Sequence, residues 1–281
     1  MIGSVSGSPL ACPVRGCTLP LARRDRTVLC PRGHAFDVAR GGYVNLLQPQ
    51  DRRSRAAGDT KAAVQARTDL LAAGIGCRML DEVVRLALET TLPALAVVVD
   101  LGCGSGDTLA RLADRRPISG IGIDLSTAAA EHAARRFPAL TWVVANADRR
   151  LPLLDASVDL VLSLHGRRNP AECARVLKAS GTLLVALPAA DDLIELRAAV
   201  QGTGTGRERG EALLAEHHPL FTAIGRSPVR ETLTLEPGLL RTVLRATYRG
   251  ARRSAAAKAE ALEAMPVTMS SEIFVLRATS G

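Results

Sequence analysis

The sequence predicts an α/β protein with a mostly parallel sheet of seven strands, preceded by a small module that holds a Cys/His cluster. From Ala96 onward, short apolar runs alternate with amphipathic helical segments, which is typical of βαβ units. A glycine-rich turn follows the first of these runs directly, and three of the six cysteines fall within the first thirty residues. A length of 281 residues suits one catalytic domain and a small appendage.

Composition restricts the core and the partners of the chain. Apolar residues make up 47% and aromatic residues 2%, so the core must be mainly aliphatic. A net charge of +8 favours an anionic partner such as RNA, although an arginine-rich genome would give the same balance. The N-terminus lacks the basic and apolar regions of a signal peptide, and no apolar run reaches the roughly eighteen residues of a membrane span. We therefore expect a cytoplasmic protein without a membrane contact.

The chain divides into three parts, which are a turn-rich module (1–47), a linker with a helical segment (48–95) and the α/β domain (96–281). Within the second part, residues 48–60 are polar and charged, and a helical pattern over 61–89 is interrupted near 74–76.

Four potential metal ligands lie in two closely spaced pairs in the first part: Cys12, Cys17, Cys30 and His34. Zinc takes such Cys3His sets in tetrahedral geometry, and a segment this short needs a metal to fold. The alternative is a set of unrelated thiols and a surface histidine.

The third part follows the expected order of elements. Strands are predicted at 97–101, 119–123, 140–144, 158–163 and 181–187, and helices at 106–115, 126–137, 170–178 and 190–200. After a mobile loop at 202–210 and a further helix, we expect a strand at 228–235, two helices at 237–247 and 254–264, and an antiparallel edge strand at 271–277.

The ends of the first strands predict a binding site for S-adenosylmethionine. Asp100 precedes the glycine turn, where a carboxylate reaches the cationic methionine part, and Asp124 ends the second strand, where it accepts ribose hydroxyls. The nicotinamide fingerprint is not matched, because its third glycine falls on Asp107. The alternative is that some of these acids only cap helices. The predicted cofactor-binding residues are Asp100, Gly102, Gly104, Asp124, Leu125, Asn146, Ala147, Asp148 and Ser163.

Catalytic side chains are expected after the fourth strand, because α/β enzymes place their chemistry at the carboxyl ends of strands. His165 is a candidate base or stacking group for the substrate, and Arg168 is a candidate for neutralising developing negative charge. An exposed loop histidine and a solvated arginine are the alternatives.

The segment CPRGHAFDVARGGYVNLL (30–47) resembles the C-P-x-x-H-x-F-D-x-A-(K/R)-x-G-Y-V-N-L-L pattern of the zinc-bearing 23S rRNA guanine-N1 methyltransferases, which include tylosin-resistance enzymes. The resemblance continues through residues 53–55, Asp59 and 65–67, the glycine turn and 168–170. It implies a Rossmann-like class I methyltransferase fold, zinc and S-adenosylmethionine as cofactors, and methylation of a 23S rRNA hairpin. Macrolide resistance and a homodimer are further expectations from it.

Four positions depart from that family. Gly76 stands where the family has a tyrosine on the cofactor, and Asp192 replaces a histidine there. Residues 165–167 replace an aromatic-Ala-Pro loop, and 246–249 replace an aromatic segment. The pocket is therefore rebuilt, the target differs, or activity is reduced. A small-molecule methyltransferase and a non-catalytic RNA-binding protein are the alternative functions.

Positive charge is uneven along the chain. Residues 1–60 hold nine arginines and four aspartates, a net +5 of the total +8. We expect the linker arginines Arg52, Arg53 and Arg55, with Arg252 and Arg253, to contact RNA phosphates.

Overall fold

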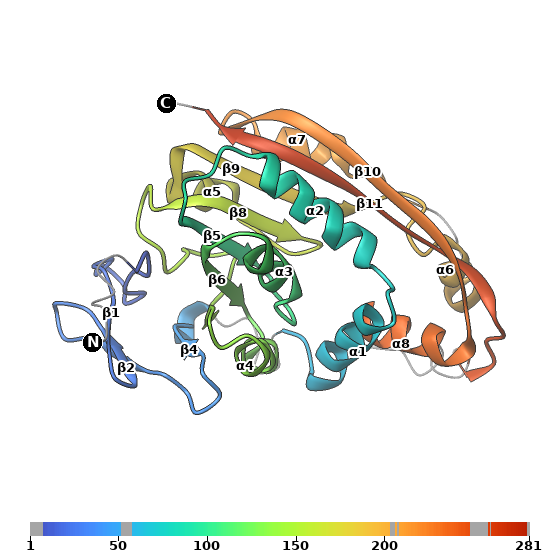
Figure 1. The fold of residues 1–281 in the computed structure, drawn as a ribbon, viewed down its shortest axis with the longest axis horizontal. Helices are drawn as coiled ribbons and strands as arrows, with labels where there is room; N and C mark the ends of the chain where they lie inside the picture. The colour runs from blue at the N-terminus through green and yellow to red at the C-terminus, as the bar shows by residue number, and fades with distance from the viewer. Residues whose placement is uncertain are drawn as a thin grey trace.

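The computed structural model describes residues 8–51, 58–202, 206, 208–247, 258 and 260–279. Its centre is an eight-stranded sheet in the order β10-β11-β9-β8-β5-β6-β7-β4 (Figure 1). The six strands from β9 to β4 are parallel, and β10 and β11 run antiparallel to their neighbours. The seven expected strands are present: β5 (Ala96–Leu101), β6 (Ile118–Asp124), β7 (Thr141–Val144), β8 (Val158–Leu164), β9 (Leu177–Pro188), β10 (Phe221–Leu235) and β11 (Met265–Ala278). The predicted α/β class is confirmed.

The eighth strand comes from the N-terminal part of the chain, which the sequence pattern did not predict. β4 (Val44–Asn45) pairs in parallel with β7, and the backbone N–H of Leu46 donates to the carbonyl of Val144 at 3.0 Å. Two residues are too short to show a period of two, so this strand exists only through its tertiary partner.

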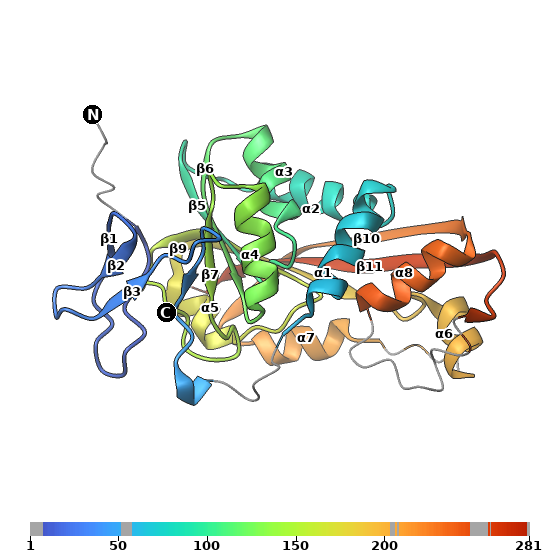
Figure 2. The ribbon, with the colours of Figure 1, turned by 90° about the horizontal axis from the view of Figure 1, so that it is seen from below.

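Helices cover both faces of the sheet. On one face lie α2 (Cys77–Glu89), α3 (Asp107–Arg115) and α4 (Thr127–Arg136), and on the other lie α5 (Pro170–Val176) and α7 (Gly210–His217) (Figure 2). Burial on both faces explains the continuous apolar runs of the parallel strands.

β9 begins at Leu177, earlier than its predicted start at 181. α5 ends at Val176, and Leu177 is already extended and pairs with Val158, so the helix predicted over 170–178 is two residues too long.

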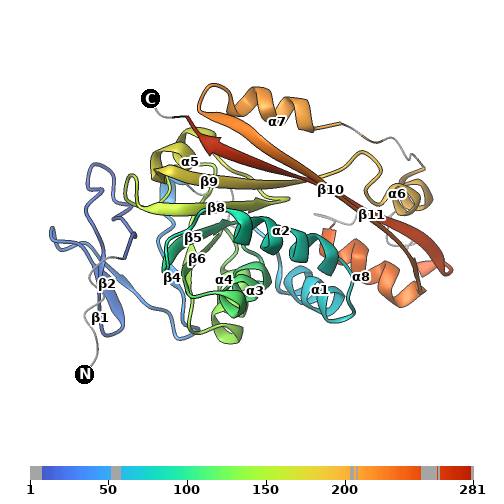
Figure 3. The same cartoon turned by 45° about the horizontal axis from the view of Figure 1, so that its top comes forward.

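A long hairpin of β10 and β11 extends past the carboxyl end of β9. Only Ser271–Arg277 of β11 pair with β9, whereas residues 265–270 pair with β10 alone. β11 therefore begins at Met265, before its predicted start at 271, and β10 begins at Phe221 rather than 228, where it pairs with the end of β11. Pro228 is tolerated because β10 is an edge strand. Beneath this overhang lie α1 (Lys61–Ala72), α6 (Ile194–Gln201) and α8 (Pro237–Thr247), which share an apolar core (Figure 3).

The N-terminal module is joined to the catalytic sheet by more than its linker. Its own sheet contains β1 (Ala22–Arg24), β2 (Thr27–Leu29) and β3 (Ala35–Asp37), and a 3-10 turn, η1 (Pro49–Asp51), follows β4. Leu10 forms an antiparallel bridge with Leu153, and one apolar cluster contains residues of both parts, for example Val28 and Leu151. The module therefore does not depend on its own few apolar residues alone.

Several expectations fall outside the described residues. These are Arg52, Arg53, Arg55, Arg252 and Arg253, residues 203–205 and 207 of the expected loop, and residues 254–257 and 259 of the expected helix. Within the described ranges, none of the helices has the length and apolar character that a bilayer crossing requires.

Candidate metal centre and cofactor site

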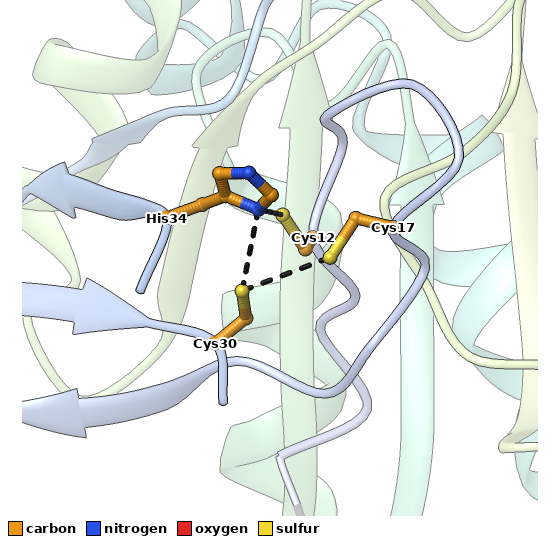
Figure 4. Close-up of side chains that lie close together, drawn as sticks. All are labelled: Cys12, Cys17, Cys30 and His34. Carbon is orange, nitrogen blue, oxygen red and sulfur yellow. Dashed lines mark hydrogen bonds between the residues drawn. The ribbon is translucent and has the colours of Figure 1, made fainter. Parts of the chain in front are cut away.

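The four predicted metal ligands lie together in the N-terminal module (Figure 4). Their ligand atoms all lie within 4.8 Å of one another. The Nδ1 atom of His34 is 3.4 Å from the sulfurs of Cys12 and Cys30, and the sulfurs of Cys17 and Cys30 are 3.7 Å apart. Zinc with bonds of about 2.3 Å to sulfur and 2.0–2.1 Å to nitrogen gives tetrahedral edges of about 3.6–3.8 Å. The donor set and its dimensions therefore fit one zinc ion.

Burial and local hydrogen bonds shift the pKa values of the Cys12 and Cys30 thiols in opposite directions. Burial raises the pKa of the Cys12 thiol to about 12. Burial opposes ionisation of Cys30 as well, but backbone hydrogen bonds from His34 and Arg32 lower its pKa to about 7. A divalent cation would favour the thiolate at all three cysteines, since the thiolate is the ligand form.

The glycine turn holds Asp124 at the carboxyl end of β6. One carboxylate oxygen accepts from the backbone N–H of Gly104 at 2.9 Å, and the other accepts from that of Ser126 at 2.7 Å. Gly102 and Gly104 have φ values of 76° and 53°, which favour glycine. Burial raises the pKa of Asp124, and these two hydrogen bonds oppose that shift.

Two buried polar atoms at the neighbouring strand ends have no hydrogen-bond partner among the described residues. They are Oδ1 of Asp100, at the end of β5, and Oγ of Ser163, near the end of β8. A buried polar atom without a partner is costly, and a polar ligand relieves that cost. Burial raises the pKa of Asp100 to about 7, with repulsion from Asp124 as a second cause, so a cationic ligand would be favoured there. This fits the methionine ammonium group of S-adenosylmethionine.

Further residues predicted to bind the cofactor lie after the end of β7. Asn146 is buried and donates from its amide to the backbone carbonyl of Asp51, and it accepts from the backbone N–H of Asp148. Asp148 forms an ion pair with Arg167. Leu125 and Ala147, directly after Asp124 and Asn146, are half-buried.

The N-terminal part of the chain also contacts these strand ends. Gly58 has a φ of 91°, and a Cβ there would lie 2.7 Å from the backbone of Ser126, so only glycine fits. The hydroxyl of Ser126 donates to the carbonyl of Asp59, and Asp59 pairs with Arg67 of α1. Asp59 and Arg67 belong to the segments that resemble the family, but local patterns predict no role for them, because their contacts connect positions that are distant in the sequence.

The loops after β8 and β9 carry the candidate catalytic residues. His165 has a φ of 51°. Part of the residue is exposed to solvent, but its ring lies against neighbouring protein, with Nε2 2.9 Å from the Ser271 hydroxyl. Surrounding protein and the charges of Arg209 and Arg67 lower the pKa of His165 to about 4, so the ring is neutral at pH 7.

Asp192, in the loop after β9, shares the influence of Arg209. Its Oδ1 accepts from the backbone N–H of Ser270 at 3.0 Å. Burial raises the pKa of Asp192 to about 6, and Arg197 and Arg209 partly oppose this shift. From the sequence, Asp192 is only a departure from the family pattern.

Arg168 is the least accessible of the candidates. Its side chain is 8% exposed, and its Nε donates to Nε2 of His217 on α7 at 3.1 Å. It therefore connects the loop after β8 to α7, and a direct role in catalysis stays a prediction.

Comparison with known proteins agrees with both sites. Residues 98–181 match a family described as a methyltransferase domain, and residues 10–55 match a zinc-ribbon family described as the N-terminal domain of RlmA. Two solved structures share the fold, each with a TM-score of 0.50. One, from Bacillus halodurans and provisionally described as a methyltransferase, is 14% identical and matches over 69% of this chain and 96% of its own. The other is the cyclase SpnF, which is 20% identical and matches over 72% and 81%.

The fold and the site thus define an S-adenosylmethionine-dependent methyltransferase that carries a zinc ribbon. The 23S rRNA (guanine(748)-N(1))-methyltransferase of Streptomyces fradiae is 39% identical over 84% of this chain and 83% of its own length. A provisionally named 23S rRNA (guanine-N1)-methyltransferase of Micromonospora griseorubida is 38% identical over 66% and 68%. The chain belongs to this family of zinc-bearing rRNA guanine-N1 methyltransferases.

Proposed function

We propose that this enzyme transfers a methyl group from S-adenosylmethionine to N1 of a guanine in a hairpin loop of 23S rRNA, in the cytoplasm. The observation that carries the proposal is the combination of a Cys3His cluster with the acidic and glycine-rich strand ends of one continuous structure. The relatives' names supply the guanine and its N1 atom. Macrolide resistance would follow if the methylated nucleotide lies in the drug site.

Each group of residues has a role in this proposal. Asp100 would face the cationic methionine end of the donor, Asp124 the ribose and Asn146 the adenine. When bound, S-adenosylmethionine supplies an electrophilic methyl group. The protein must align the guanine with it and accept the N1 proton.

Two side chains are candidates for the proton acceptor. The carboxylate of Asp192 has a pKa raised by burial to about 6, which is closer to neutral pH than that of His165 and makes it the stronger base. His165 would then stack on or hydrogen-bond the flipped guanine. The zinc module would hold the RNA.

Methylation of unmodified 23S rRNA tests this function. We expect one methyl group per rRNA and a primer-extension stop at the modified guanine, because an N1 methyl blocks Watson–Crick pairing. Replacing that guanine with adenine should abolish both signals. If donor binding is intact but no rRNA is labelled, the proposal is wrong and a small-molecule substrate becomes the better hypothesis. Homodimer formation stays a prediction that light scattering would test.

A further inference from the structure

Arg67 projects from α1 toward the glycine turn. Its side chain is 33% exposed, and two of its three nitrogens are engaged. Nη2 pairs with Asp59 at 2.5 Å, and Nε donates to the carbonyl of Ala246 on α8 at 3.3 Å. These contacts fix the guanidinium plane between α1, α8 and the segment before α1.

The third nitrogen faces the turn. Nη1 lies 3.2 Å from the position that a Cβ on Gly104 would occupy. In the described part of the chain, no acceptor is hydrogen-bonded to Nη1. A side chain at residue 104 would therefore displace the guanidinium. Glycine at this position allows the N–H groups of Nη1 to lie close to the turn.

Arg67 also acts electrostatically on two parts of the site. Burial is the main influence on the pKa of both Asp124 and His165, and the positive charge of Arg67 lowers both values. The guanidinium thus lies within range of the ribose end and of the loop after β8. The methionine part of the donor must cross this interval to bring its methyl group to the substrate.

The charges of the donor match this arrangement. S-adenosylmethionine has a cationic sulfonium, a cationic ammonium group and one anion, its α-carboxylate. The carboxylate of Asp100 can pair with the cationic groups of the donor. For the α-carboxylate, the described glycine turn itself provides only backbone N–H groups. Arginine pairs strongly with carboxylates because its N–H groups form a planar fork.

We propose that Arg67 binds the α-carboxylate of S-adenosylmethionine and that Asp59 positions the guanidinium for this contact. This inference rests on the proposed function, since it depends on the same donor. It adds a cationic side chain that binds the donor's carboxylate, which the family comparison did not supply. It would also supply a contact to the donor in a chain that has Gly76 where its family has a tyrosine.

Calorimetry with two ligands tests this inference. S-adenosylmethionine and its decarboxylated analogue differ at the carboxylate, so their affinity ratio reports that contact. We expect the wild-type chain to prefer S-adenosylmethionine by about tenfold or more, as a charge-assisted hydrogen bond implies. Arg67→Gln should abolish the preference and leave affinity for the analogue within about twofold, whereas Arg67→Lys should keep part of it.

Arg111→Gln is the matched control, because Arg111 is similarly exposed and pairs with Asp81 on α2, away from the turn. It should retain the full preference. If Arg67→Gln and Arg67→Lys keep the wild-type ratio, or lower both affinities equally, the inference is wrong. If the wild-type chain binds neither ligand, the donor assignment and the proposed function fail with it.

Discussion

The zinc module and the carboxyl ends of the parallel strands assemble their functional groups in different ways. In the module, all four ligands come from 23 consecutive residues, Cys12 to His34, and converge within 4.8 Å. At the strand ends, Asp59, Asp124, His165 and Asp192 come from four distant segments. A local site is determined by spacing, whereas a site at the strand ends is determined by the sheet and by the helices that cover it.

The two regions also differ in what they need from a ligand. The apolar environment of the cysteines is continuous with the catalytic core, and their ligand atoms lie at distances that suit one shared metal ion. At the strand ends most polar groups already have protein partners, and only Asp100 and Ser163 keep a buried unpartnered atom among the described residues. Loss of ligand should therefore affect folding in the module and affinity at the strand ends.

The largest effect is expected from loss of zinc. Cys30→Ala should release the ion and unfold the module, because structural zinc contributes about 10–16 kcal/mol in small zinc-binding peptides. That is as large as the total stability of a typical domain, about 5–15 kcal/mol. Metal analysis should give one zinc per wild-type chain and none in the variant.

Cys77→Ala is the control for a cysteine outside the cluster, since its thiol donates to Leu71 and lies beside Arg111. It should retain zinc. Hydrogen exchange should show lost protection in Cys30→Ala at β2, β3 and the β4–β7 edge. A metal-free chain that keeps native protection there would contradict the contrast between the two regions.

Sequence spacing was sufficient for the metal site but not for all of the strand ends. The ligand pairs, the glycine turn, Asp100 and Asp124 follow from local patterns, and the structure brings each group to one place. The eighth strand and the contacts of Gly58 and Arg67 could not be predicted, because they exist only between segments that are far apart in sequence. The buried position of Arg168 could not be predicted either, because its partner His217 is 49 residues away in the sequence.

The next largest effect concerns the proton acceptor. General-base catalysis contributes about 10²–10⁴-fold, so Asp192→Asn should lower the single-turnover methylation rate by that order. A base must be ionised to act, and the pKa of Asp192 is about 6 because the carboxyl is buried. The wild-type rate should therefore be level above that pH and fall about tenfold per unit below it.

His165→Asn separates this assignment from the other candidate. The pKa of His165 is about 4, because surrounding protein desolvates the ring, so as a base it would keep the wild-type rate level down to about pH 5. If the wild-type rate stays level down to about pH 5 and His165→Asn loses most of that rate, His165 is the base. Donor affinity measured in parallel should not change in either variant.

The smallest effect is expected at Asp124, the acid that we propose binds the ribose. Each oxygen of Asp124 already accepts one backbone N–H and keeps a second lone pair, which suits the two ribose hydroxyls. Asp124→Asn keeps the size of the side chain but removes the charge and one acceptor. A charge-assisted hydrogen bond contributes about 1.5–3 kcal/mol, so calorimetry should show at least tenfold weaker donor binding. Asp114→Asn, exposed on α3, should bind normally, and zinc content should be one per chain in both. Because the site at the strand ends is formed by many segments, Asp124→Asn should lower donor affinity without unfolding the protein. If Asp124→Asn instead loses its fold as Cys30→Ala does, Asp124 is primarily a structural group of the glycine turn and the ribose is held elsewhere.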